Sequence, residues 1–107
     1  MEHPIESVYF ISDGNFVKIG KTINIKQRFR DIQVANPKKL TLLHVVEGNE
    51  NILQSLFTKY HERGEWYRIE DKLSDFLFCK ELHEEILDFC WSIMEYGIYE
   101  AVGMNSK

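Results

Sequence analysis

Two apolar runs near the N-terminus flank a short polar turn and predict a β-hairpin. The first run, the turn and the second run read Val8–Ile11, Ser12–Asn15 and Phe16–Thr22. The turn contains Asp-Gly, a strong hairpin signal. If Ile11 pairs with Phe16, then Tyr9 lies directly opposite Lys18 on one face, next to the bare backbone of Gly20. The opposite face of the hairpin is apolar and suits a core.

This expected pair gives the hairpin two interpretations. A lysine ammonium a few ångströms from a phenol favours the phenolate, which would make Tyr9 a candidate general base beside Lys18. Tyrosine is also a common strand residue, and a lysine next to it is an ordinary surface pair. The hairpin alone leaves both interpretations open.

A helix with an unusually placed arginine follows the hairpin. Asn24 is a suitable N-cap, and an apolar stripe at helical spacing consists of Ile25, Phe29 and Ile32. Arg28 lies on this stripe, whereas Lys26 and Arg30 point elsewhere. An arginine on the inward side of a helix is rarely left unpaired. Its partner is therefore either a buried carboxylate or the phosphate of a ligand.

The rest of the pattern predicts further strands and helices. Leu40–Val46 is apolar on both faces, which indicates a central strand. Beyond it we expect a helix from about Glu50 to Arg63, a short strand over Gly64–Ile69, and helices over about Asp71–Phe78 and Glu81–Gly97. Together these elements predict one α+β domain over residues 1–107, a small mixed sheet opened by the hairpin and flanked by helices. Its core spans about residues 7–70, with a C-terminal helical extension over about 71–101.

The second helix carries a polar stripe beside its apolar one. The stripe consists of Glu50, Gln54, Thr58 and His61. A polar stripe is either a solvated face or one wall of a cleft.

Composition fits a packed domain of a reducing compartment. The chain has 107 residues, of which 44% are hydrophobic, and no apolar run is as long as a membrane span. Its first residues are polar, unlike a secretory signal, so we expect a cytoplasmic protein without a membrane partner. Cys79 and Cys90 lie in apolar stretches and are interpreted as buried thiols. The four histidines are scattered, so no zinc site is expected.

Charge is distributed unevenly along the chain. The net charge is −4, but residues 18–39 carry seven basic side chains and one acid, a segment net of +6. Residues 65–107 carry ten acids and four basic side chains, a net of −6. The basic segment suits a polyanion, and the acidic C-terminal helices could contact a protein partner.

In their order and spacing, these residues resemble the GIY-YIG endonuclease superfamily. The opening match is Val8-Tyr9-Phe10-Ile11 followed by Val17-Lys18-Ile19-Gly20, closest to the phage and microbial branch whose second motif reads lysine-isoleucine-glycine. It continues with Arg28 and Gln33 before Asn36-Pro37, then with Leu53, Phe57 and Arg63-Gly64-Glu65-Trp66-Tyr67. The match covers about residues 7–70.

The resemblance implies a DNA endonuclease that uses one divalent ion, Mg²⁺ or Mn²⁺. Carried over to this chain, Tyr9 takes a proton from the attacking water, Arg28 holds the phosphate and Glu65 holds the metal. Lys18 stands where many relatives have a second tyrosine. Glu50, one turn before Gln54, is the alternative metal ligand. The side chains expected to contact DNA are Lys21, Lys26, Arg30, Lys38 and Lys39.

One position departs from the family pattern. The second helix of this branch usually carries a histidine where this chain has Gln54, which cannot act as an acid or base near neutral pH. His61, further along a similar face, is a candidate substitute. A relative that binds nucleic acid without cutting it is therefore a second interpretation, and a protein-interaction module is a third. The sequence leaves the DNA target and the oligomeric state open.

Overall fold

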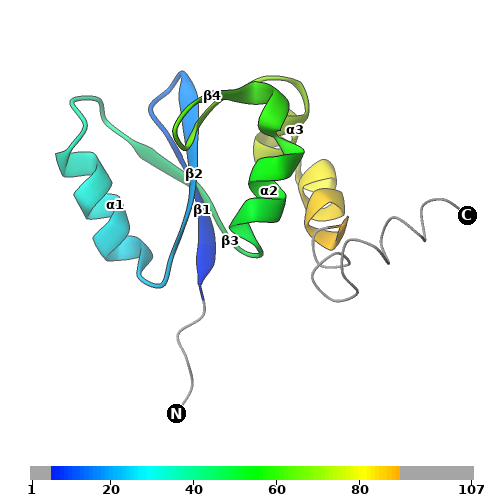
Figure 1. Ribbon diagram of the computed structural model, residues 1–107, viewed down its shortest axis with the longest axis horizontal. Helices are drawn as coiled ribbons and strands as arrows, with labels where there is room; N and C mark the ends of the chain where they lie inside the picture. The colour runs from blue at the N-terminus through cyan, green and yellow to red at the C-terminus, as the bar shows by residue number, and fades with distance from the viewer. Residues whose placement is uncertain (1–5, 90–107) are drawn as a thin grey trace, which may run out of the picture.

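The computed structural model describes residues 6–89 (Figure 1). In chain order the elements are β1 (Ser7–Ser12), β2 (Phe16–Thr22), α1 (Ile25–Val34), β3 (Thr41–Glu47), α2 (Glu50–Leu56), the short 3-10 turn η1 (Thr58–Tyr60), β4 (His61–Arg63), β5 (Trp66–Arg68), α3 (Asp71–Phe78) and a helical segment over residues 80–89. Cys90 and the part of the expected C-terminal extension beyond residue 89 lie outside the described residues. Within residues 6–89, no helix combines the length and the apolar character needed to cross a bilayer.

The five strands form one sheet in the order β3-β1-β2-β5-β4. The α+β class, the N-terminal hairpin and the C-terminal helices are confirmed. Every neighbouring pair of strands is antiparallel, so the expectation of a mixed sheet is wrong. α1 carries the chain from β2 to the free side of β1, and β3 therefore pairs with β1 and not with β2.

The turn of the hairpin is tighter than its sequence suggests. The Asp13 N–H donates to the Phe16 carbonyl at 3.1 Å, which leaves Gly14 and Asn15 as the loop. The Asp13 carboxylate also accepts hydrogen bonds from the N–H groups of Asn15 and Phe16, at 2.9 and 2.8 Å. Gly14 has φ 104°, a conformation that glycine adopts without a Cβ clash.

This tighter turn shifts the register of the hairpin by two residues. Tyr9 lies opposite Gly20, and Lys18 lies opposite Ile11, so the expected direct pairing of Tyr9 with Lys18 is wrong. Because side chains alternate with a period of two, a two-residue shift leaves each one on its expected face. Tyr9, Lys18 and Gly20 therefore still share one face of the sheet.

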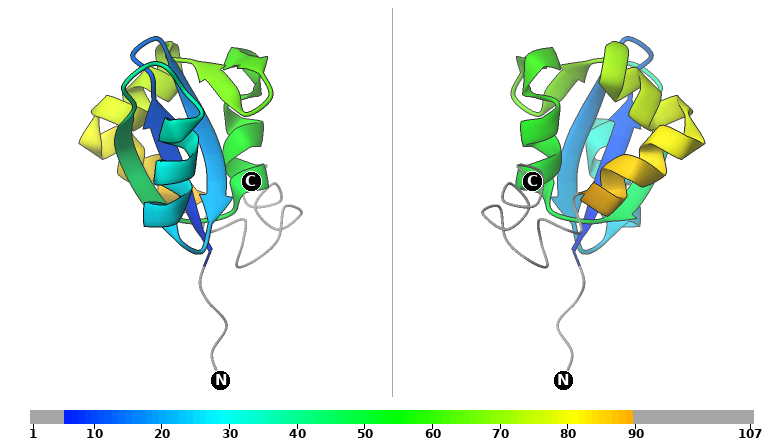
Figure 2. Two further views of the ribbon diagram at one scale, coloured as in Figure 1. Left: turned by 90° about the vertical axis from the view of Figure 1, so that its left-hand side faces the viewer. Right: turned by 90° about the vertical axis from the view of Figure 1, so that its right-hand side faces the viewer.

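Helices cover both faces of the sheet. α1 lies on one face, and α2, α3 and residues 80–89 lie on the other (Figure 2). Under α1, a small cluster buries Tyr9, Ile11 and Leu40 against Ile25, Phe29 and Ile32. On the other face, the larger cluster buries Val8, Phe10, Val17 and Ile19 against Leu53, Phe57, Leu73 and Phe76. Tyr9, Lys18 and Trp66, discussed below, lie on the α1 face, whereas Glu50 and Gln54 belong to α2.

β3 is an edge strand, not the central strand expected from its apolar faces. Leu42 is 39% and Val45 is 42% exposed, because α1 covers β1 more fully than β3. Apolar residues on both faces of a strand therefore do not identify a central position in this sheet.

α2 is shorter than expected and ends at Leu56. Its N-cap is the expected Asn49, whose side chain accepts the Ile52 N–H at 3.1 Å. At the C-terminal end, the Thr58 hydroxyl donates to the carbonyls of Gln54 and Ser55, at 3.2 and 3.0 Å. Such side-chain bonds compete with continued helical bonding. The chain then turns through η1 into the β4–β5 hairpin, whose strand β4 occupies the end of the expected helix.

Candidate active site

Tyr9 fills a space that only a glycine on the neighbouring strand leaves open. Its side chain is completely buried on the α1 face. A Cβ built on Gly20 would overlap the hydroxyl and Cζ of Tyr9 and lie 3.0 Å from its Cε2. The ring thus lies directly over the backbone of Gly20. The glycine of the second motif is explained by this close approach, because its backbone has no positive φ.

The Tyr9 hydroxyl has no hydrogen-bond partner of acceptable geometry within residues 6–89. A buried polar atom without a partner costs free energy, and in a native protein it often marks a place that a ligand or water completes. Arg28 of α1 approaches this hydroxyl, as its position on the inward stripe predicted. Its neighbour is thus a phenol, not one of the two expected partners, a carboxylate or a phosphate.

The surroundings of Tyr9 favour the neutral phenol in this state. Burial raises the pKa of Tyr9 above its ordinary value of 10.0, and the negative charge of Glu65 raises it further. The Arg28 guanidinium lowers the pKa, but less than burial and Glu65 together raise it. The cation that favours the phenolate is therefore Arg28, whereas Lys18 was expected to do so.

The Lys18 side chain lies beside Glu65 and Trp66. Its Nζ lies 3.2 Å from Oε1 of Glu65 and 5.5 Å from the ring centroid of Trp66. Lys18 and Trp66 are register partners on β2 and β5, which places both on the α1 face. Its charge is thus held beside a carboxylate and an aromatic ring.

The backbone of Ile19 ties three elements of the site together. The Ile19 N–H donates to the carbonyl of Glu65 at 3.0 Å, which holds the turn between β4 and β5 against β2. The Ile19 carbonyl accepts the side-chain amide of Gln54 at 3.0 Å, which holds α2 against the same strand. Gln54 therefore makes a structural contact at the position where the family resemblance led us to expect a histidine. Glu65 has the fixed backbone expected of a metal ligand.

The two carboxylates considered as alternatives lie together. Burial raises the pKa of the Glu50 carboxyl, and Glu65 raises it further by its charge and by a hydrogen bond to protonated Glu50. Lys21 opposes this shift, and it lines a small hollow with Glu6 and Glu50. The first turn of α2 and the β4–β5 turn thus present a pair of carboxylates beside Tyr9.

The Glu50–Glu65 pair supplies some of the ligands that one divalent ion needs. Paired carboxylates repel each other unless a proton or a cation lies between them. Mg²⁺ is commonly held by one or two carboxylates together with water and substrate phosphate. No group of three or more His, Cys, Asp or Glu side chains in residues 6–89 could enclose a metal by itself. Glu50 and Glu65 therefore suit an ion that the substrate helps to bind.

Comparison with known families identifies the family of the chain. The family model of the T5orf172 domain matches residues 6–91, which include every residue of the site described above. The chain belongs to the T5orf172 domain family. This family is related to the GIY-YIG superfamily, as the motifs indicated. No curated protein and no solved structure matches the chain.

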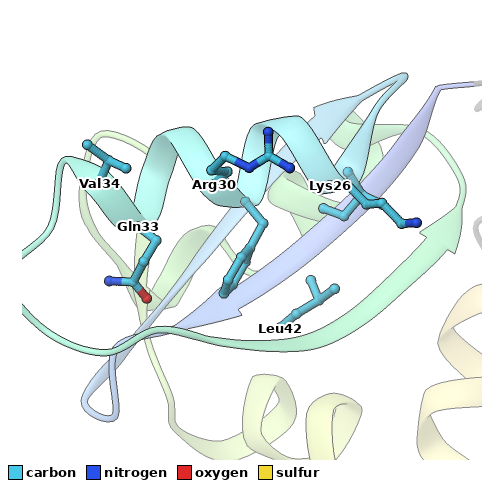
Figure 3. A pocket seen from close by; sticks show the side chains of 7 residues that line it. Lys26, Arg30, Gln33, Val34 and Leu42 are labelled. Atoms are coloured by element: carbon cyan, nitrogen blue, oxygen red, sulfur yellow. The ribbon is translucent and has the colours of Figure 1, made fainter.

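Two basic residues of this T5orf172 domain lie away from Arg28. Lys26 and Arg30 border an apolar hollow of about 550 Å³ between α1 and β3, into which Leu42 points (Figure 3). The hollow is lined by neither Arg28 nor Lys18, Glu50 or Glu65. Both residues lie on the opposite side of α1 from Arg28, because residues two apart on a helix point about 200° apart.

The remaining candidate residues also lie outside this group. Lys38 and Lys39 follow α1 in an exposed loop, and Lys39 borders a hollow at the β1–β2 turn. His61 belongs to β4, where its ring nitrogen lies 2.7 Å from the Gly64 carbonyl oxygen and its ring contacts Tyr67. Because α2 ends at Leu56, the expected polar stripe that joined His61 to Gln54 does not exist.

Sequence reasoning missed the contribution of Trp66 to the site of the T5orf172 domain. Trp66 packs partly on the cluster around Tyr9 and also lines a hollow with Lys18 and Arg28. Its signal was the tryptophan in the Gly-Glu-Trp motif, directly after a candidate metal ligand. Gln33, by contrast, is explained structurally, because its amide bonds to the backbone of Lys38 and Leu40, at 2.8 Å each, and closes the loop after α1.

Proposed function

We propose that this T5orf172 domain is a metal-dependent endonuclease that hydrolyses DNA phosphodiester bonds. The observation that carries the proposal is the unpartnered, buried hydroxyl of Tyr9, which Arg28 approaches and which is within electrostatic reach of the Glu50–Glu65 pair. Phosphodiester hydrolysis needs a base for water, positive charge on the phosphate and charge stabilisation at the leaving oxygen. Family membership and this arrangement of side chains support the same reaction.

Each side chain has a separate role in the proposed reaction. Arg28 binds a non-bridging phosphate oxygen, since a guanidinium stays charged and suits bidentate contact. The phenolate of Tyr9 accepts a proton as the water oxygen bonds to phosphorus and the bond to the leaving oxygen breaks. Glu50 and Glu65 would hold the divalent ion, Mg²⁺ or Mn²⁺, and the ion would supply positive charge at the leaving oxygen.

The pKa of Tyr9 determines how cleavage depends on pH. The pKa of Tyr9 is raised by burial and by Glu65, so the phenol is almost entirely protonated at neutral pH before substrate binds. Arg28 favours the phenolate, and neutralising the charge of Glu65 removes one cause of the raised pKa. Cleavage by the phenolate should therefore increase with pH, because the reactive fraction increases.

Cleavage of supercoiled, linear and branched DNA with Mg²⁺, with Mn²⁺ and with a chelator tests the proposal. Tyr9→Phe removes only the hydroxyl and should lower cleavage by about 10²–10⁴-fold, as expected for loss of a general base, while the fold and DNA affinity persist. Cleavage by the variant within threefold of wild type would exclude Tyr9 from the reaction. Folded wild-type protein that cuts none of these DNAs with either metal would contradict the proposal.

A second candidate function is nucleic-acid binding without cleavage. Gln54, which cannot transfer a proton near neutral pH, and the raised pKa of Tyr9 both favour it. This function predicts salt-dependent DNA binding with no metal-dependent product. A protein-interaction module working through the acidic C-terminal helices predicts neither result.

A further inference from the structure

A second hollow opens next to Arg28, between α1 and the start of β5. Its volume is about 400 Å³, within the size range of small-ligand sites. The side chains that line it include Trp66, Lys18, Arg28, Ile32, Asp31 and Asn36. The surface of the hollow between α1 and β3 is almost entirely apolar, whereas this hollow exposes polar and apolar surface in similar amounts. Arg28 belongs both to this hollow and to the surroundings of the Tyr9 hydroxyl.

We infer that this hollow binds one unstacked nucleobase of the substrate, next to the phosphate held by Arg28. The inference rests on the proposed function for the identity of that phosphate. It assigns the substrate class: DNA in which the nucleotide beside the cut is single-stranded, as in a single strand, a gap or a branch. A base within an intact duplex is stacked on both faces and would first have to leave the helix.

The aromatic ring of Trp66 is the main reason. Part of the indole packs on the cluster under α1, and the remainder faces the hollow. Bases stack on aromatic side chains, and they also stack on the plane of an arginine guanidinium. Trp66 and Arg28 supply both kinds of surface within one hollow, and Ile32 adds an apolar wall.

The polar groups of the hollow can contact the edge of a base. The Asn36 side-chain oxygen accepts the Lys38 N–H at 2.9 Å, and the Asn36 side-chain nitrogen makes no hydrogen bond within residues 6–89. One carboxylate oxygen of Asp31 accepts the Gln27 amide at 2.8 Å, which leaves acceptor capacity on that carboxylate. The hollow thus offers a donor and an acceptor beside a stacking surface, the combination with which proteins bind single-stranded bases.

The charge of the hollow also suits a nucleotide. Lys18 and Arg28 contribute two positive charges and Asp31 one negative charge, and Lys18 is also ion-paired with Glu65 at 3.2 Å. Lys18 lies near the Trp66 ring, so the phosphates flanking a stacked base would lie near a cation.

Tryptophan fluorescence can report directly on this hollow. The chain contains two tryptophans, so Trp91→Phe leaves Trp66 as the only indole. This protein is titrated, in chelator, with a mixed-sequence single-stranded oligodeoxynucleotide and with an abasic strand of equal length. Both strands carry the same phosphates, so their salt-dependent electrostatic contributions match. We expect the strand with bases to quench Trp66 and to bind about 5- to 150-fold more tightly, corresponding to 1–3 kcal/mol for a stacked base.

A substitution provides the second measurement. Trp66→Leu should remove most of the preference for bases and leave affinity for the abasic strand unchanged within about twofold. Phe78→Leu is the matched control, because Phe78 is an exposed aromatic residue (65%) that does not line the hollow. This control should keep the full preference. If Trp66→Leu does not fold, the quenching of Trp66 still tests the inference.

The outcomes separate this inference from the proposed nuclease. Equal binding of the two strands, no quenching, or a preference that survives Trp66→Leu would overturn the subsite, even if the protein cuts DNA. Quenching with a base preference that Trp66→Leu removes would support it, even if no DNA is cut with either metal. In that second case the nuclease proposal alone would fail.

Discussion

Replacing Gly20 by alanine tests the packing on which the whole site depends. The added Cβ would overlap the hydroxyl and Cζ of Tyr9, whose side chain is completely buried. The overlap involves ring atoms in the middle of a sheet, so it cannot be relieved by rotating the end of a flexible chain. Overpacking of this kind typically costs about 1–3 kcal/mol.

One smaller, opposing effect reduces the net loss of stability. Glycine-to-alanine changes stabilise by about 0.4–1 kcal/mol through the unfolded chain where the backbone allows them, and Gly20 has no positive φ. The net loss should therefore lie between about 0 and 2.6 kcal/mol, and each kcal/mol lowers the Tm by roughly 4–8 °C in a domain of this size. If Tyr9 moves by about 1 Å to relieve the overlap, cleavage should fall by about 10²-fold.

Thermal unfolding and DNA cleavage of the same preparations measure both effects. Gly48→Ala is the matched control, since its Cβ would lie 3.5 Å from Leu53 Cδ1, an ordinary contact, and its φ is not positive. It should match or slightly exceed the wild-type Tm. In a Tyr9→Leu background, Gly20→Ala should cost at least about 1 kcal/mol less than in the wild type, because the overlapping atoms are gone. A Gly20→Ala protein with wild-type Tm and activity would refute the packing argument.

Three further predictions concern the charges of the site. Arg28→Ala should lose cleavage and weaken DNA binding, whereas Arg30→Ala, on the far side of α1, should change cleavage and DNA affinity less than threefold. If the two variants behave alike, the proposed phosphate contact of Arg28 is wrong. Ultraviolet titration of metal-free protein, with Tyr9→Phe as the blank, should give a Tyr9 pKa above 10.0, and Arg28→Gln should raise this pKa further because it removes the charge that lowers it. The surroundings of Glu50 raise the pKa of its carboxyl in the folded protein. Ionised Glu50 therefore destabilises the metal-free fold at a pH above this folded-state pKa. The penalty disappears at a pH below the pKa of the unfolded chain, near 4.5. Glu50→Gln should therefore raise the urea midpoint at neutral pH and lose this advantage as the pH falls towards 4.5; a gain that is independent of pH would show that the charge is not the cause.

Local sequence signals correctly predicted the features whose geometry depends on one short segment. Asn24 and Asn49 cap their helices as expected, because a side-chain oxygen at the N-cap needs only the next turn of its own helix. Arg28 was placed on the inward face of α1 by helical spacing alone. The two faces of the hairpin were also predicted correctly, even though its register was not, because alternation along a strand does not depend on the partner.

Contacts between distant segments could not be predicted in this way. The register that brings Tyr9 over Gly20 depends on how the Asp13 turn closes, and an error of two residues leaves the pattern of faces unchanged. The edge position of β3 depends on how far α1 extends across the sheet, which no alternation along the strand records.

The amino-acid sequence by itself determined the α+β class, the opening hairpin, the helix caps and the family to which the chain belongs. The tertiary structure alone decided that Glu50 and Glu65, fifteen residues apart, lie together, that Arg28 rather than Lys18 approaches Tyr9, and that Trp66 lines a hollow beside them. The physical reason is that local patterns depend on backbone geometry over a few residues. The electrostatics of a site instead depend on distances and burial between segments, which are set only when the sheet and helices pack.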